Sequence, residues 1–199
     1  MDGNGNVVFE RKLPGSAVRA AEELISEFGI SIVGYDGDDL YTTEQTEAVV
    51  SLSEYYGEPT MELILKTTTS KLLAEHGSGM HKLLLMDDNA DLLTKSVRPR
   101  LEELAREHGA TVTQALPTML ELLPGGCSKA HGVGKVCEAL GIDAATELLA
   151  LGEMLENAAI GVAVGNACPR ARDAADFIMR ERHDEGGAGL AMNLFGFDV

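Results

Sequence analysis

Tryptophan is absent from this 199-residue sequence, and aromatic residues make up only 5% of it. A core built from such a chain must be aliphatic and rich in alanine. Hydrophobic residues account for 45% of the sequence, an ordinary share for a globular protein. The length then allows one large or two small domains.

Basic residues are also scarce, with 16 Lys and Arg against 32 Asp and Glu and a formal net charge of −16. Binding to nucleic acid depends on clustered Lys and Arg, so we expect no nucleic-acid partner. The same charge repels anionic substrates in general, and any phosphate site therefore needs a locally positive pocket. An acidic, solvated surface is the simplest interpretation of the charge.

The three cysteines, Cys127, Cys137 and Cys168, form no C-x-x-C pair. Because an odd count without a pairing pattern is typical of a reducing compartment, we expect three small buried apolar residues rather than thiol chemistry. Apolar runs such as 158–164 are too short to span a bilayer, and the N-terminus lacks a signal pattern. We expect a cytoplasmic protein without membrane contact, although a processed organellar protein would look the same.

Residues 13–117 alternate between helical and extended patterns. Apolar residues recur at helical spacing from Ala17 to Phe28, and Gly29 ends that helix. The acidic turn 36–39 joins two strand-like runs and is typical of a hairpin tip, since the ligand spacing of a calcium loop is absent. Strands are predicted over 7–12, 30–35, 40–42, 81–86, 111–115 and 119–123, and helices over 42–56 (opened by a Thr42/Gln45 capping box) and 92–108. Residues 60–76 are predicted to form a second amphipathic segment, in which the run 67–70 favours a strand or a cap over a helix interior.

The most informative stretch runs from residue 121 to residue 166. A strand end and a Pro-Gly-Gly turn precede a predicted helix, and apolar strands follow that end near Glu153 and Asn166. Strand, helix and strand in this order predict a parallel α/β unit. Such sheets place ligands at the carboxyl ends of their strands, so Lys129, Glu153 and Asn166 are the first candidates for a site.

Lys129 is the best of these candidates. Ser128 is a suitable N-cap for the helix, Gly141 a suitable stop, and Lys129 falls in the first turn. Free amide groups and the positive end of the helix dipole favour a phosphate there, and the lysine adds a full charge. A plain surface lysine is the alternative. Glycines at 132 and 134 inside the helix indicate close packing against another backbone or a loosened helix.

The same stretch resembles the haloacid dehalogenase-like (HAD) phosphatases of the Cof type. The resemblance rests on Ser128-Lys129, on 148–153 followed by Met-Leu-Glu, and on Gly-Val-Ala-Val-Gly-Asn-Ala at 161–167. Residues 170–189 are similar to the closing strand and acidic turn of that family. The resemblance implies an α/β protein with a parallel, Rossmann-like core and an inserted α/β cap domain.

Two departures from the family pattern bear on activity. No Asp-x-Asp-Gly-Thr strand, which carries the nucleophile of the family, opens this sequence. The acidic metal loop is also shortened, because Glu153 runs directly into Met154. Glu153 stands where the first aspartate of that loop is expected, and the second aspartate and the asparagine are missing. The sequence therefore matches an incomplete HAD-like core.

By this resemblance, Lys129 is catalytic, and Ser128, Lys129 and Asn166 bind phosphate. Glu153 is the metal ligand and Mg²⁺ the cofactor, although one carboxylate makes a weak magnesium site. In the predicted cap, Tyr35, Asp36, His76 and His81 could face a ligand; a structural role is favoured for each.

We expect residues 1–12 and 118–199 to form the partial core and residues 13–117 to form the cap. The cap should hold an antiparallel or mixed sheet with helices on one face, and the strands ending near 123, 151 and 164 should belong to the core. The missing first strand should leave the strand 148–151 exposed, and self-association or a partner chain should cover that edge.

The predicted function is that of a HAD relative, ancestrally a Mg²⁺-dependent phosphatase of small phosphorylated metabolites, with little or no activity as this chain. The alternatives are a non-catalytic binding or scaffold subunit of a larger assembly, and a truncated chain that needs a complementing segment.

Overall fold

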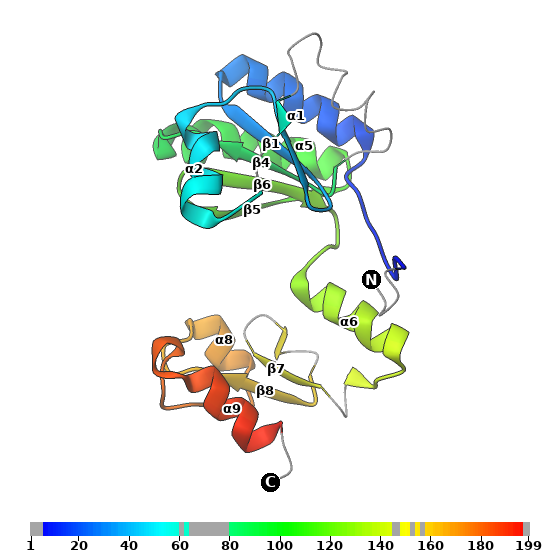
Figure 1. The fold of residues 1–199 in the computed structure, drawn as a ribbon, viewed down its shortest axis with the longest axis vertical. Helices are drawn as coiled ribbons and strands as arrows, with labels where there is room; N and C mark the ends of the chain where they lie inside the picture. The colour runs from blue at the N-terminus through cyan, green and yellow to red at the C-terminus, as the bar shows by residue number, and fades with distance from the viewer. Residues whose placement is uncertain are drawn as a thin grey trace. The chain divides into compact units, whose positions relative to one another are not determined.

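The computed structural model describes residues 6–59, 62–63, 80–144, 148–151, 154–155 and 158–196. The chain divides into two compact units (Figure 1). The larger unit comprises Arg11–Cys127, and the smaller unit comprises Met1–Glu10 together with Ser128–Val199. Within the described ranges, no helix is long and apolar enough to cross a membrane.

The larger unit is built on a six-stranded mixed sheet of strand order β3-β2-β1-β4-β6-β5. Its strands are β1 (Ser31–Asp36), β2 (Asp39–Thr42), β3 (Glu62–Leu63), β4 (Lys82–Met86), β5 (Ala110–Leu116) and β6 (Met119–Pro124). Every neighbouring pair is antiparallel except β2 and β3. Gly37 turns the β1–β2 hairpin with a φ of 66°, a conformation that glycine adopts without strain. The predicted hairpin at the acidic turn is confirmed.

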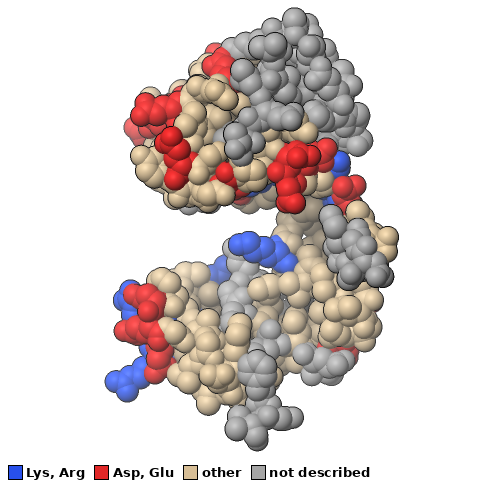
Figure 2. All heavy atoms as spheres, viewed as in Figure 1, with Lys and Arg blue, Asp and Glu red and all other residues tan. Residues whose placement is uncertain are grey.

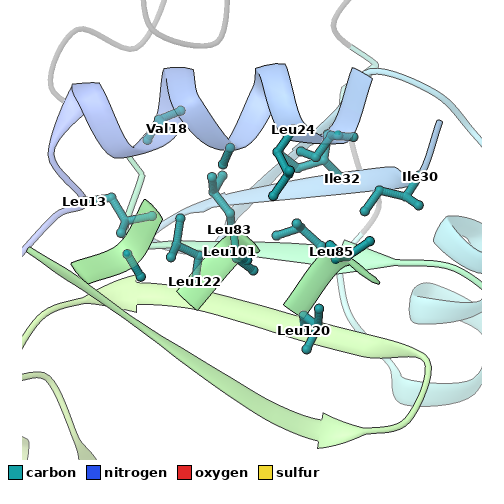
Figure 3. Packing of buried hydrophobic residues seen from close by; sticks show 14 of the residues in the cluster. Leu13, Val18, Leu24, Ile30, Ile32, Leu83, Leu85, Leu101, Leu120 and Leu122 are labelled. Atoms are coloured by element: carbon teal, nitrogen blue, oxygen red, sulfur yellow. The ribbon is translucent and has the colours of Figure 1, made fainter. Parts of the chain in front are cut away.

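Helices α1 (Gly15–Phe28) and α5 (Arg98–Glu107) pack on one face of this sheet. The α5 helix continues without a break from α4 (Ala90–Leu92) and a π-helical turn, η1 (Leu93–Val97). Figure 3 shows the aliphatic side chains of α1, α5 and the strands meeting between these layers. The burial of Leu83, Leu85, Leu120 and Leu122 is complete, so this face forms the main core.

The opposite face of the sheet carries a second, smaller cluster. Val33 and Leu84 alternate with the residues of the main core along their strands and pack against Val49 and Leu52 of α2 (Glu47–Tyr56). The mixed sheet is as predicted. The prediction that helices cover only one face is wrong, because α2 also presents an apolar side and buries it against the other face.

The smaller unit contains a three-stranded parallel sheet of order β7-β8-β9. Its elements are α6 (Lys129–Leu140), β7 (Leu149–Leu151), β8 (Ile160–Ala163), α8 (Pro169–Ala174), β9 (Phe177–Ile178), η3 (His183–Glu185) and α9 (Gly187–Phe195). The predicted parallel pairing of 148–151 with 160–164 is confirmed. The buried cluster of this unit consists of Val162, Met179 and Ala191.

Strand β6 does not belong to the partial core where we expected it. It pairs with β4 and β5 in the large sheet, and its alternating residues Leu120 and Leu122 fill the main core. The β6–α6–β7 segment is therefore not a βαβ unit of one sheet, since β6 and β7 lie in different sheets. Residues 118–127 pack with the larger unit.

Three local predictions also fail. Thr42 is not a helix cap: it ends β2, fully buried, and its hydroxyl donates to the carbonyl of Ile32 at 2.8 Å, while Thr46 caps α2. The described residues 7–12 form no strand. Of the cysteines, only Cys137 is buried; Cys127 is half-buried and Cys168 exposed, and all three are free thiols. The predicted amphipathic segment at 60–76 lies outside the described residues except for 62–63, which form β3.

Candidate phosphate-binding site

The first turn of α6 has the geometry of a well-capped helix start. Ser128 is extended, with φ −151° and ψ 165°, and its Oγ accepts the backbone N–H of His131 at 3.0 Å. At the other end, Gly141 adopts the left-handed conformation and donates its N–H to the carbonyls of Cys137 and Glu138. The predicted helix and both of its caps are confirmed. The Oγ atom of Ser128 therefore acts as the helix cap, and its O–H remains a donor that this hydrogen bond does not use.

Lys129 is the first residue of α6, and its side chain is exposed. The structure records no ion pair or hydrogen bond of its ammonium group within the described residues. The other lysine of the helix, Lys135, is held by Glu138 at 2.6 Å. The backbone amides of residues 129 and 130 point out of the helix start, where they have no intrahelical acceptor. Among the described residues, a cation without a recorded partner thus stands beside N–H groups without an intrahelical acceptor, which is an arrangement suited to an anion.

His131 takes part in packing rather than in this arrangement. Its ring lies against Phe9, with 5.2 Å between the ring centres, and Lys135 lies 5.9 Å from the centre of the same Phe9 ring. The Nε2 atom of His131 is buried and has no hydrogen-bond partner in the part of the chain that the structure describes.

Asn166 follows β8 in the Gly165-Asn166 turn, at the carboxyl end of the strand as predicted. Its side-chain oxygen accepts the backbone N–H of His183 at 3.0 Å, and its amide nitrogen lies 2.7 Å from Nδ1 of the same residue. The amide therefore clamps the η3 segment onto the turn. Nothing in the sequence pattern indicated this partnership with His183, which lies seventeen residues away.

Gly165 shows why this turn is so close to the neighbouring segment. Its N–H donates to the carbonyl of Glu181 at 2.8 Å, and a Cβ at this position would collide with the carbonyl oxygen of Arg180. Arg172 donates to the Gly165 carbonyl at 2.9 Å. The turn after β8 is thus closely packed and hydrogen-bonded at the carboxyl edge of the parallel sheet. No recorded interaction joins Asn166 to Lys129.

Glu153, the expected metal ligand, lies outside the described residues, as does His76. Within the described ranges, no group of three or more His, Cys, Asp or Glu side chains is placed to hold a metal ion. The residues described here do not by themselves form a magnesium site.

The remaining cap candidates have structural partners. Tyr35 is buried under Lys82, whose Nζ lies 4.1 Å from the ring centre, and burial, with Glu58 and Glu121 nearby, raises the pKa of the phenol to about 12. Asp36 accepts from Lys12 at 2.6 Å. His81 accepts the backbone N–H of Gly37 at 2.9 Å and so fixes the hairpin tip.

Comparison with known proteins decides the family. Residues 1–190 match the family model described as haloacid dehalogenase-like hydrolase. The chain belongs to the haloacid dehalogenase-like hydrolases. The fold agrees with this assignment: TM0651 from Thermotoga maritima, a solved structure, superposes with a TM-score of 0.80 and 21% sequence identity over 98% of this chain and 72% of that one.

Two curated relatives match this HAD chain almost throughout. The Arabidopsis thaliana protein "Endoribonuclease YBEY, chloroplastic" is 29% identical over 97% of this chain and 33% of its own length. The Bacillus subtilis (strain 168) protein "Putative phosphatase YkrA" is 28% identical over 96% of this chain and 70% of its own length. The chain thus spans a third of one relative and about 70% of the other.

Proposed function

We propose that this chain serves the hydrolysis of small phosphorylated metabolites and that the start of α6 holds their phosphate. The observation that carries the proposal is the start of a helix capped by Ser128, where Lys129 has no recorded ion pair among the described residues and lies beside amides without an intrahelical acceptor. Membership of the HAD hydrolases and the likeness to YkrA support a phosphoric monoester as substrate. Asn166 would act in this site as a positioning residue, because His183 already engages its amide.

The second part of the proposal is that these 199 residues on their own hydrolyse phosphate esters too slowly to exceed the background rate. The sequence contains no Asp-x-Asp-Gly-Thr segment, and its acidic loop is reduced to Glu153. Covalent catalysis needs an attacking residue, and its loss commonly removes several orders of magnitude in rate. Magnesium enters only through the family, whose hydrolases generally use it, with Glu153 as its proposed ligand; no step of the proposal depends on the ion.

RNA cleavage, which the name of the Arabidopsis relative gives for that protein, is not part of the proposal. The match covers only a third of that protein. A formal net charge of −16 also opposes binding to a polyanion. On the face shown in Figure 2, acidic side chains gather over the larger unit with few basic side chains among them.

The binding part is tested with inorganic phosphate titrated into the purified chain by calorimetry. We expect weak binding that Lys129→Ala reduces about tenfold, the effect of one lost charged contact of about 1.4 kcal/mol. Lys135→Ala is the matched control, because this lysine lies on the same helix and is paired with Glu138. Equal effects of the two substitutions, or none from Lys129→Ala, would refute a phosphate site at the helix start.

The catalytic part is tested with p-nitrophenyl phosphate and common sugar phosphates in the presence of Mg²⁺. We expect no hydrolysis above background from the 199-residue chain. Robust magnesium-dependent turnover that disappears in Lys129→Ala would show that another carboxylate supplies the nucleophile. That result would overturn the slow-turnover proposal while supporting the phosphate site.

A further inference from the structure

We propose that the ring of His183 is a pH-sensitive switch, which decides whether the side-chain amide of Asn166 is held by the protein or available to a ligand. Asn166 lies in the turn after β8 and His183 opens η3, and two hydrogen bonds join the two residues. The inference concerns this pair itself, so it does not depend on the phosphate site proposed at the start of α6.

The polarity of the first hydrogen bond fixes the orientation of the amide. A backbone N–H can only donate, so the atom of Asn166 that faces the N–H of His183 at 3.0 Å must be the side-chain oxygen. The NH2 group of Asn166 consequently faces Nδ1 of the His183 ring at 2.7 Å. Because an NH2 group donates and does not accept, Nδ1 must carry a lone pair and the proton of the ring must lie on Nε2. The two bonds together therefore require a neutral ring in one tautomer.

A protonated ring is incompatible with this pair of bonds. Both nitrogens of a charged imidazole carry a proton, so an N–H at Nδ1 would point at the NH2 group of Asn166. If the amide turned over, its oxygen would accept from the ring, but its NH2 group would then face the backbone N–H of His183. One of the two hydrogen bonds is lost in either orientation, so protonation of the ring opens the contact.

The charged ring has another partner within reach. The Oδ1 atom of Asp184 lies 3.7 Å from Nδ1 of His183. Arg182 donates from Nε to the same oxygen at 3.0 Å, and this hydrogen bond holds the pKa of the Asp184 carboxyl below its ordinary value. Asp184 therefore remains a carboxylate in weak acid. An ion pair between His183 and Asp184 can then replace the bond to the amide, which releases the NH2 group of Asn166.

The other charged groups recorded around this pair have partners of their own. Arg172 of α8 donates to the carbonyl of Gly165 at 2.9 Å, and Glu185 accepts the backbone N–H of Arg182 at 3.0 Å. The side chain of His183 is 68% exposed, so protons from solvent reach the ring directly. Asp184 is thus the carboxylate that the protonated ring meets among the described residues.

Backbone bonds confine the change to the two side chains. Gly165 donates its N–H to the carbonyl of Glu181 at 2.8 Å, and Met179 donates to the carbonyl of Ala163 at 2.7 Å. Neither bond involves the ring, so the segment before η3 stays against the turn when the ring is charged.

The released group lies where a ligand can use it. Asn166 follows β8 at the carboxyl edge of the parallel sheet, and parallel sheets bind their ligands at that edge. With a neutral ring, the oxygen and the NH2 group of the amide both have partners in the protein. In weak acid the NH2 group becomes a hydrogen-bond donor for a ligand. The charge of His183 therefore controls one donor at this edge.

The test is a ¹⁵N NMR titration of the full chain from pH 8 to pH 5, the range in which histidine side chains ordinarily change charge. At pH 8 we expect the His183 ring to carry its proton on Nε2. As the ring becomes charged, the side-chain NH2 signals of Asn166 should shift along the same titration curve. A proton on Nδ1 at pH 8, or NH2 signals that do not follow the ring, would overturn the proposal.

The variant His183→Asn separates the bond from the charge. Its side-chain oxygen offers an acceptor close to the place of Nδ1, and it cannot be protonated in this range. Most of the pH-dependent shift of the Asn166 NH2 signals should therefore disappear. His108→Asn, which removes a half-buried histidine of the larger unit, is the matched control and should leave the shift unchanged.

A shift in His183→Asn as large as that of the parent chain would also overturn the proposal. Circular dichroism would verify that the variants are folded. The tautomer is measured on the unsubstituted chain, so that part of the test needs no variant.

Discussion

The two units of this chain differ in how completely they bury their apolar side chains. The larger unit buries a main cluster that includes Leu83, Leu120 and Leu122 at zero exposure, and a second cluster lies on the opposite face of its sheet. The smaller unit has a buried cluster of three residues. Of the fifteen large hydrophobic residues that are exposed in the described ranges, eleven belong to the smaller unit.

This difference shows that a good local pattern does not guarantee a complete core. The α6 helix has both of its caps, and β7 and β8 pair in register, yet the smaller unit leaves its apolar surface uncovered. Burial of apolar area is the dominant favourable term in folding. We therefore expect the two units to differ in stability, and the following experiments break or sharpen that comparison.

The largest expected effect is separate unfolding of the two units. All four tyrosines, at positions 35, 41, 55 and 56, lie in the larger unit and there is no tryptophan, so tyrosine fluorescence reports on that unit alone. In a urea titration, circular dichroism should begin to fall at a concentration roughly 1 M or more below the fluorescence transition. Coincident transitions would show one cooperative unit and remove the basis of the comparison.

A cavity in the main core should have the next largest effect. Leu120→Ala deletes a fully buried side chain of β6, and such substitutions cost about 2–5 kcal/mol. The fluorescence-detected free energy of unfolding should fall by about 3 kcal/mol, while exchange in the β8 amides stays unchanged. Leu194→Ala, in exposed α9, is the control and should shift the fluorescence transition by less than about 0.5 kcal/mol.

A buried carboxyl makes the stability of the larger unit depend on pH. Glu22 of α1 is 7% exposed, and its Oε2 atom has no hydrogen-bond partner among the described residues. Burial raises its pKa to about 7, against a smaller opposing effect of Arg19. The folded unit therefore holds a proton that the unfolded chain releases above its ordinary pKa of 4.5, and stability is lost as pH rises from that value through 7.

The fluorescence-detected free energy of unfolding should accordingly fall by roughly 2 kcal/mol between pH 5 and pH 8. Glu22→Gln should flatten this dependence and raise the stability at pH 8. Glu23→Gln is the control, because Glu23 is adjacent in sequence but exposed, and its substitution should leave this pH dependence unchanged. If Glu22→Gln left the pH dependence of the free energy of unfolding unchanged, a group other than Glu22 would be responsible for it.

The smallest effect concerns the helix of the smaller unit. A Cβ at Gly132 would meet no atom of the described residues within 4 Å, so the structure shows no close packing there and favours the alternative of a loosened helix. Gly132→Ala should stabilise α6 by about 1 kcal/mol, seen as a later dichroism transition. Gly141→Ala is the matched opposite, because its φ of 70° suits glycine and the substitution should destabilise the helix. If both Gly132→Ala and Gly141→Ala stabilised the helix, this explanation of the two glycines would be wrong.

The sequence predicted those features that depend on local chemistry. Helix α1 with its left-handed Gly29, the hairpin at Gly37 and the Ser128 cap all follow from spacing and turn residues, and all appear in the structure. The position of β6 did not follow, because its alternation of Leu120 and Leu122 fits either sheet. Only the partners across the sheet decide, and these lie about forty residues away on β4.

The candidate site likewise has features that the sequence predicted and features that it did not. The helix start at Lys129 could be read from neighbouring residues, since caps and dipoles act within one turn. The clamp between Asn166 and His183 could not, because it joins two turns that meet only after β8 and β9 have paired. Glu153 lies outside the described residues, and its role as metal ligand stays a prediction.

The larger unit also carries a consequence for the order of folding. Its two ends meet, because Arg11 donates to the carbonyl of Gly125 at 2.9 Å, and all of its residues are continuous in the chain. The smaller unit combines the segments on either side of it. During synthesis, all residues of the larger unit therefore leave the ribosome before the helix that begins at 129. Once this unit has folded, the segments on either side of it are no longer separated by a long flexible loop, so the entropy cost of bringing them together is lower. Folding of the larger unit first would therefore bring the two chain segments of the smaller unit, which end at Glu10 and begin at Ser128, close together before that unit folds.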